Sequence, residues 1–88
     1  MMFVKNFTSL YDIYFSMSTC IAKIVGQNIK NARKEKGLTQ SDVAKFFLMT
    51  QQQYSRFENG VFELNYEQII KICKLLSITP NEIFGFDL

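Results

Sequence analysis

The sequence lacks several residue types and patterns on which metalloproteins and many enzymes depend. It contains no histidine, which excludes a histidine-based zinc site and a histidine general base. Its two cysteines, Cys20 and Cys73, lie far apart and do not have the spacing of metal ligands. We therefore expect two reduced thiols in a cytoplasmic protein, and no metal or other cofactor.

Enzymatic and membrane functions lack their usual signatures as well. The chain has no glycine-rich phosphate loop and no paired nucleophile and base. No apolar run approaches the length of about 20 residues that a membrane span requires, and no cluster of positive charges at the N-terminus marks a secretory signal. We expect a protein that is not an enzyme and that resides in the cytoplasm.

The composition is that of one small folded domain. The chain has 88 residues, of which 48% are hydrophobic, including nine phenylalanines and four tyrosines. Such a composition argues against disorder and leaves apolar surface for a partner. The formal net charge of +2 permits binding to nucleic acid but does not by itself indicate it.

Residues 1–22 differ from the rest and form an aromatic-rich N-terminal extension, whereas residues 23–88 form the domain proper. Four residues of the extension recur at the spacing of one helical face: Phe7, Leu10, Tyr11 and Tyr14. Three interpretations remain open. The extension packs on its own domain, it forms a dimer contact, or it is unstructured or untranslated because Met17 serves as an alternative start.

The domain itself shows the apolar periodicity of five short helices and no sustained alternation of period two. The first is expected to begin at Ile24, to run for about ten to thirteen residues, and to end before Gly37. The others are expected to follow the N-cap candidates Thr39, Thr50, Asn65 and Thr79. The fourth helix is apolar around most of its circumference, which predicts a central and well-buried position.

The third predicted helix, Gln51 to Glu58, has two chemically different faces. At about 100° per residue, amide, hydroxyl and guanidinium groups gather on one side and aromatic rings on the other. The polar face carries Gln51, Gln52, Ser55, Arg56 and Asn59, and the aromatic face carries Tyr54 and Phe57. Glutamine can pair with adenine and arginine with guanine in the major groove, although a glutamine run also makes a merely soluble face.

Residues 24 to about 85 resemble the XRE or Cro/C1-type helix-turn-helix domain, which has the lambda-repressor-like fold. The resemblance rests on an Arg-x-x-x-Gly-Leu-Thr-Gln string from Arg33 to Gln40, on Thr50-Gln51 at the start of the third helix, and on the Leu-Ser-Ile-Thr-Pro-Asn-Glu-Ile-Phe tail of residues 76–84. It implies an all-α, five-helix domain whose third helix enters the major groove.

The residues and the resemblance together give each polar position an expected role. The residues expected to contact bases are Gln51, Gln52, Ser55 and Arg56. Those expected to contact the DNA backbone are Gln40, Thr50 and Asn59. Lys30, Lys34, Lys36 and Lys45 could add attraction that weakens with salt. By resemblance, Arg33 and Glu58 form a structural ion pair.

One position departs from the family pattern. Related domains usually have glycine in the turn between the second and third helices, where this chain has Leu48. A branched residue seldom accepts a positive φ. We therefore expect the turn to be reshaped.

The function predicted from the sequence is that of a DNA-binding transcriptional regulator, specifically a repressor that binds palindromic half-sites in double-stranded DNA as a homodimer. The alternative is a protein-interaction module, or an antitoxin-type protein with a toxin partner, that uses the same fold with little or no DNA binding. The surplus of aromatic residues favours the alternative, and the polar face of the third helix favours DNA.

Overall fold

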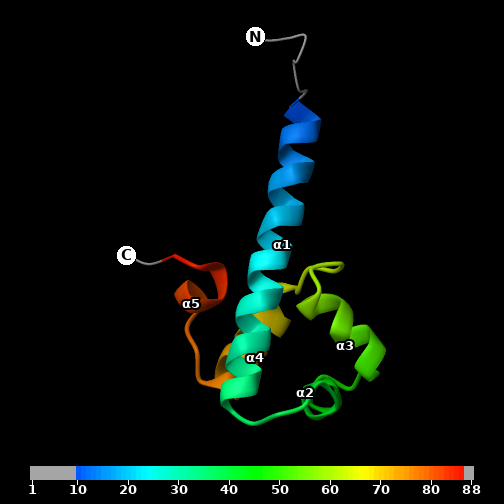
Figure 1. Ribbon diagram of the computed structural model, residues 1–88, viewed down its shortest axis with the longest axis vertical. Coiled ribbons are helices and arrows are strands. Elements are labelled where there is room, and N and C mark those ends of the chain that lie inside the picture. The colour runs from blue at the N-terminus through cyan, green and yellow to red at the C-terminus, as the bar shows by residue number, and fades with distance from the viewer. Residues whose placement is uncertain (1–9, 87–88) are drawn as a thin grey trace.

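The computed structural model describes residues 10–86, and within the first helix it describes the side chains of Leu10 and of residues 20–35. Over this range the chain forms five helices and no strand (Figure 1). They are α1 Leu10–Glu35, α2 Gln40–Phe46, α3 Gln51–Glu58, α4 Tyr66–Leu76 and α5 Pro80–Phe84. The prediction of an all-α, five-helix domain is confirmed.

Four of the helices begin with a capping box, in which the N-cap side chain accepts a hydrogen bond from the N3 backbone N–H and the N3 side chain accepts one from the N-cap N–H. The pairs are Thr39 and Asp42, Thr50 and Gln53, Asn65 and Gln68, and Thr79 and Glu82. All four predicted N-caps are therefore correct. Pro80 follows its cap at the first helical position, where its missing N–H has no intrahelical partner to lose.

The first helix is longer than predicted. Instead of ten to thirteen residues from Ile24, α1 has 26 residues, so the predicted boundary between residues 22 and 23 lies inside a continuous helix. No glycine or proline interrupts residues 10–25, and Ala22 continues the buried stripe of Val25 and Ile29 by one turn. At about 1.5 Å per residue the helix is about 39 Å long, and its first half extends away from the other helices (Figure 1).

The aromatic face predicted for the extension can be followed only in part. Phe7 and residues 1–9 as a whole lie outside the described residues, as do the side chains of Tyr11 and Tyr14. Leu10 is described and its side chain is 84% exposed. The backbone is helical from Leu10 onwards.

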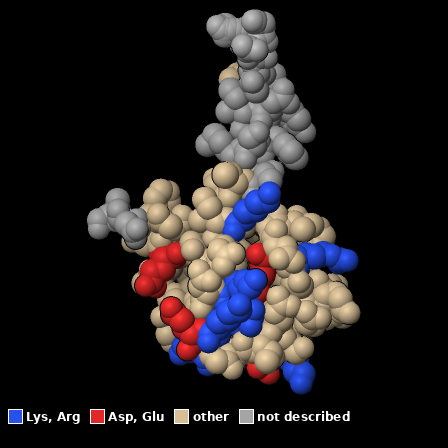
Figure 2. Space-filling model, viewed as in Figure 1, with Lys and Arg blue, Asp and Glu red and all other residues tan. Residues whose placement is uncertain are grey.

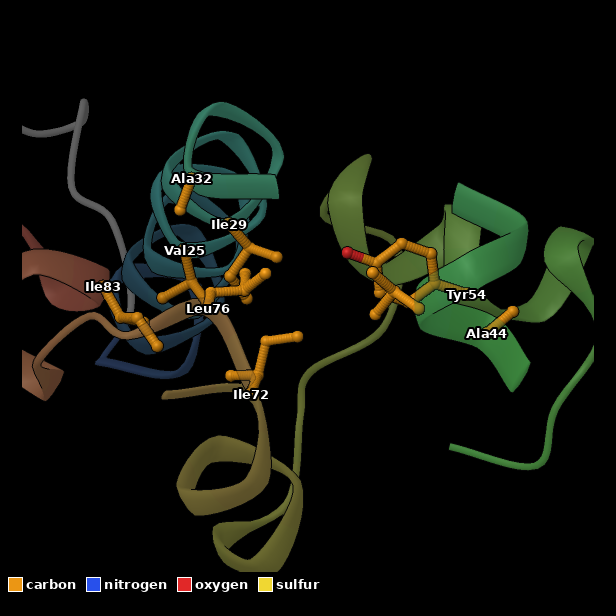
Figure 3. Packing of buried hydrophobic residues seen from close by; sticks show 9 residues of the cluster. Val25, Ile29, Ala32, Ala44, Tyr54, Ile72, Leu76 and Ile83 are labelled. Carbon is orange, nitrogen blue, oxygen red and sulfur yellow. The ribbon is translucent and has the colours of Figure 1, made fainter. Parts of the chain in front are cut away.

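The core lies where α1 packs against α3, α4 and α5, and α2 joins it through its packing on α3. Figure 3 shows Val25, Ile29 and Leu76 together, and Ala44 beside Tyr54. Among the described residues, the buried hydrophobic side chains are Ala22, Val25, Ile29, Ala32, Val43, Ala44, Tyr54, Ile72, Leu76 and Ile83. Four of the ten come from α1, so the central helix is α1.

The prediction that the fourth helix is central and well buried is correct only in part. In α4, Ile72 and Leu76 are buried and three further apolar residues are half-buried, whereas Ile70 is 56% exposed. Helix α4 packs against α1 and α5. Its apolar circumference therefore did not indicate full burial, because small domains leave much apolar surface in contact with water.

The crossing of α1 over the end of α3 depends on Gly26. A Cβ atom at this position would lie 2.4 Å from the carbonyl oxygen of Glu58 and 2.5 Å from that of Phe57. One turn earlier in α1, the backbone of Lys23 lies close to Gly60, which has a φ of 75° and ends α3. Two points on α1 therefore fix how α3 is placed.

The turn between α2 and α3 is not reshaped, contrary to the prediction. Leu48 has a φ of 57°, in the left-handed region that glycine favours. Its N–H donates to the carbonyl of Lys45, and that of Met49 donates to the carbonyl of Ala44, which is the bonding pattern of a Schellman ending. The Met49 side chain packs against the core. These contacts keep the turn geometry although the residue is leucine.

We expect Leu48→Gly to raise the free energy of unfolding by about 0.5–1 kcal/mol. The left-handed conformation costs a residue with a Cβ about 1–2 kcal/mol, and the greater entropy of glycine in the unfolded chain offsets part of the gain. The Leu48 side chain is 93% exposed, so its removal sacrifices little packing. Urea denaturation measures the change. Leu48→Ala, which keeps the Cβ and hence the backbone cost, is the control and should change stability by less than about 0.5 kcal/mol. Equal effects of the two substitutions would contradict the explanation.

Candidate nucleic-acid interface

The helix-turn-helix places α3 with its aromatic side inward. Tyr54 is 1% exposed and packs in the core with Ala44 of α2, while Phe57 packs against the core edge. The opposite side of α3 faces solvent: Gln51, Gln52 and Arg56 are exposed, and Ser55 is half-buried. The division of the helix into two faces is thus present, and the exposed amides of Gln51 and Gln52 lie at its N-terminal end.

A buried ion pair lies directly behind this face. Arg33 of α1 donates from Nε to Oε2 of Glu58 at 2.6 Å and from Nη2 to Oε1 at 3.1 Å, and its Nη1 donates to the carbonyl of Leu38 at 2.8 Å. The side chains are only 8% and 1% exposed. The structure therefore brings together the two residues that the resemblance assigns to an ion pair, and joins the end of α3 to α1.

The surroundings of Glu58 act on its protonation in opposite directions. Burial favours the neutral acid, but the hydrogen bonds donated by Arg33, and to a lesser degree the one from Gln40, outweigh it, so the pKa of Glu58 lies below its usual value. Burial, together with the neighbouring Glu58 carboxylate, raises the pKa of Tyr54. At neutral pH the cluster therefore holds a carboxylate, a guanidinium and a neutral phenol.

Gln40, at the start of α2, links this cluster to the exposed polar face of α3. Its Nε2 donates to Oε1 of Glu58 at 3.0 Å, and its own Oε1 accepts a hydrogen bond from Nε2 of Gln51. The sequence assigned Gln40 to the DNA backbone and gave no sign of these two contacts. They join residues 18 and 11 positions apart, so only the packing of α2 on α3 reveals them.

The other two residues predicted to contact the DNA backbone, Thr50 and Asn59, lie at the two ends of α3. Thr50 is the N-cap, and its Oγ1 accepts from the backbone N–H of Gln53 at 3.1 Å. Asn59 is the C-cap, and its Nδ2 donates to Oγ of Ser55 at 3.2 Å. Both are exposed. Gln53 points to the side and caps the helix, since its Oε1 accepts from the N–H of Thr50.

On the face shown in Figure 2, basic and acidic side chains are interspersed. The four lysines considered for non-specific attraction, Lys30, Lys34, Lys36 and Lys45, are exposed or half-buried. The described residues include no group of three or more side chains able to hold a metal ion. Nor is any of the helices that the structure covers long and apolar enough to cross a membrane.

Two short helices joined at a tight turn, the second of them exposing a polar face, define a helix-turn-helix domain. Comparison with known families agrees: the model of the helix-turn-helix family matches residues 29–83, and the chain belongs to this family. The family is one of DNA-binding regulators, which generally act by binding rather than by catalysis.

The chain is also similar to the antitoxin PezA of Streptococcus pneumoniae serotype 4. The two are 34% identical over 64 residues, which is 73% of this chain. The chain spans only about 40% of the length of that relative. No solved structure matches it.

Proposed function

We propose that the chain is a sequence-specific transcriptional repressor that reads the major groove with α3. The observation that carries the proposal is the exposure of the Gln51 and Gln52 amides at the N-terminal end of a helix whose other face is anchored in the core. The N-terminal residues of such a helix are those that reach the base edges. A glutamine amide matches N6 and N7 of adenine with one acceptor and one donor.

The other proposed contacts with DNA follow from the position of α3 in the major groove. Ser55 and Arg56 continue the exposed face towards the C-terminal end of α3 and are assigned to bases. Gln40, Thr50 and Asn59 flank that face and are assigned to phosphates, which set the register of the protein on DNA. Gln40 is also hydrogen-bonded to Gln51 and Glu58. It would therefore hold the Gln51 side chain in position for its base while it contacts a DNA phosphate.

A single domain of this kind offers few base contacts, so we further propose a cytoplasmic homodimer that binds two half-sites about one helical turn apart. The contact between protomers could come from the first half of α1, or from one of the exposed phenylalanines Phe46 and Phe86, which are 47% and 63% exposed. Phe84, in contrast, is partly buried against the core.

The proposal is tested by a mobility-shift assay on DNA selected from a random pool, at a stated salt concentration. We expect Gln51→Ala with Gln52→Ala to weaken binding to the selected sequence by about 1–3 kcal/mol for each bidentate pair that is lost. Binding to unrelated DNA should change little, because that binding comes from phosphates.

Gln27→Ala is the matched control, because it removes an exposed amide from α1 whose hydrogen bond goes to Asn31 of the same helix. Its affinity should equal that of the unchanged protein. If the double substitution on α3 left specific binding intact, these amides would not read bases. If no sequence were selected at all, the repressor function itself would be wrong.

A second candidate function is that of an antitoxin-type protein that binds a toxin. It is favoured by the similarity to a protein named as an antitoxin, and by the apolar side chains that remain exposed. An antitoxin can also bind DNA, so the two functions are compatible. A partner bound by the variant with both glutamines replaced would support this candidate separately from DNA binding.

A further inference from the structure

Arg56, near the end of α3, lies against an aromatic ring from the loop that follows. Its guanidinium carbon is 5.7 Å from the centre of the Phe62 ring, a distance at which the cation is attracted to the ring. Both side chains remain accessible, Phe62 being 49% exposed. The ring therefore shares the exposed surface of the proposed interface with Arg56.

The Phe62 ring is itself held in place. It makes an edge contact with Phe57, with ring centres 6.2 Å apart at 63°, and Phe57 packs against the core. The backbone adds a second restraint, because the N–H groups of Val61 and Phe62 both donate to the carbonyl of Arg56, at 2.8 and 3.3 Å. Gly60, which lies between Arg56 and Val61, has a left-handed conformation that lets the chain turn back towards the end of α3.

The contact with the Phe62 ring restricts the flexible side chain of Arg56. A free arginine loses much rotamer freedom when it is fixed on a ligand, and prior fixation removes part of that loss. A guanidinium carries five N–H donors, so those that do not face the ring remain available to an acceptor. Two such donors match O6 and N7 of guanine.

We propose that Phe62 is a positioning residue for DNA recognition, and that its ring holds the guanidinium of Arg56 ready to pair with a guanine in the major groove. The inference rests on the proposed function. It adds to that function a guanine as the base that Arg56 reads, and a role for a residue outside α3. Phe62 itself touches no base in this scheme. It acts through Arg56.

The test compares Phe62→Leu with Phe62→Tyr on the selected DNA and on single base-pair variants of it. Leucine keeps an apolar side chain but has no ring face, so binding should weaken about three- to five-fold. Tyrosine keeps the ring and should bind within about two-fold of the unchanged protein. Arg56→Ala should lose about ten-fold or more of the discrimination at one G·C pair, and Phe62→Leu should lose part of the discrimination at that same pair.

A double-substitution cycle separates positioning from a merely structural role. In the Arg56→Ala background, Phe62→Leu should have no further effect on affinity. An equal loss in both backgrounds, or no loss in either, would overturn the inference. So would an Arg56→Ala loss that is uniform over all sequences, because that result assigns Arg56 to phosphate. These results are distinguishable from failure of the proposed function, in which the Gln51 and Gln52 variant already binds like the unchanged protein.

Discussion

Replacing Arg33 with alanine is expected to lower the free energy of unfolding by about 3–5 kcal/mol at neutral pH, because the buried Glu58 carboxylate loses its cation. A loss of this size is a large fraction of the total stability of a small domain. Gln40 would remain as a donor to Glu58, but one neutral amide does not replace a bidentate guanidinium. Urea denaturation at pH 7 measures the change.

The pH dependence of this loss identifies its cause. In the unchanged protein the folded-state pKa of Glu58 is lowered, so the contribution of this residue is present above the unfolded-state pKa of about 4.3 and is lost as the pH falls through the folded-state value. Without Arg33, burial instead favours the neutral acid. The difference in stability between the two proteins should therefore shrink as the pH falls towards 4.

Glu67→Ala is the control for Arg33→Ala, because it breaks an ion pair that is exposed to solvent instead of buried. Its partner is Lys71 at 3.3 Å, with side chains 75% and 51% exposed, and its removal should cost less than about 1 kcal/mol. Similar losses for Arg33→Ala and Glu67→Ala would contradict the assignment of a buried pair.

Under conditions where the Arg33 variant is folded, its affinity should fall for all DNA sequences alike, because the pair sets the orientation of α3. Intact DNA affinity at low salt would show that it does not.

Gly26→Ala is expected to lower the free energy of unfolding by about 3 kcal/mol, which is the reverse of what this substitution does in a free helix. In an isolated helix alanine is favoured over glycine by about 1 kcal/mol. Here the added Cβ would lie 2.4–2.5 Å from two carbonyl oxygens at the end of α3, and backbone atoms cannot rotate away as a side chain can. Helices α1 and α3 must therefore separate, and thermal or urea unfolding measures the cost.

The neighbouring Gln27→Ala provides the comparison for Gly26→Ala. It adds the same residue at the next position of α1, where the side chain is exposed, and should change stability by no more than about 0.5 kcal/mol. A Gly26→Ala protein that is as stable as this control would show that α1 and α3 do not approach so closely. Since the same contact places α3, DNA affinity should fall together with stability.

The sequence determined those features of the fold that depend on a few adjacent residues. Each predicted N-cap was correct, because a capping box joins residues only three positions apart. The two faces of α3 followed from helical periodicity in the same way. The Arg33 and Glu58 pair was reached by resemblance alone, since nothing local relates two residues 25 positions apart.

The tertiary structure decided the remaining features, because each depends on segments that are distant in the sequence. Packing of α2 on α3 holds Leu48 at a φ that its side chain disfavours, and it brings Gln40 between Glu58 and Gln51. The position of α1 made that helix central and left part of α4 exposed, although the sequence placed the apolar residues of α4 inside. The return of the chain after Gly60 set Phe62 beside Arg56. Local sequence fixes where a helix begins and which face is polar, but contacts between helices decide which of its polar groups remain free for a ligand.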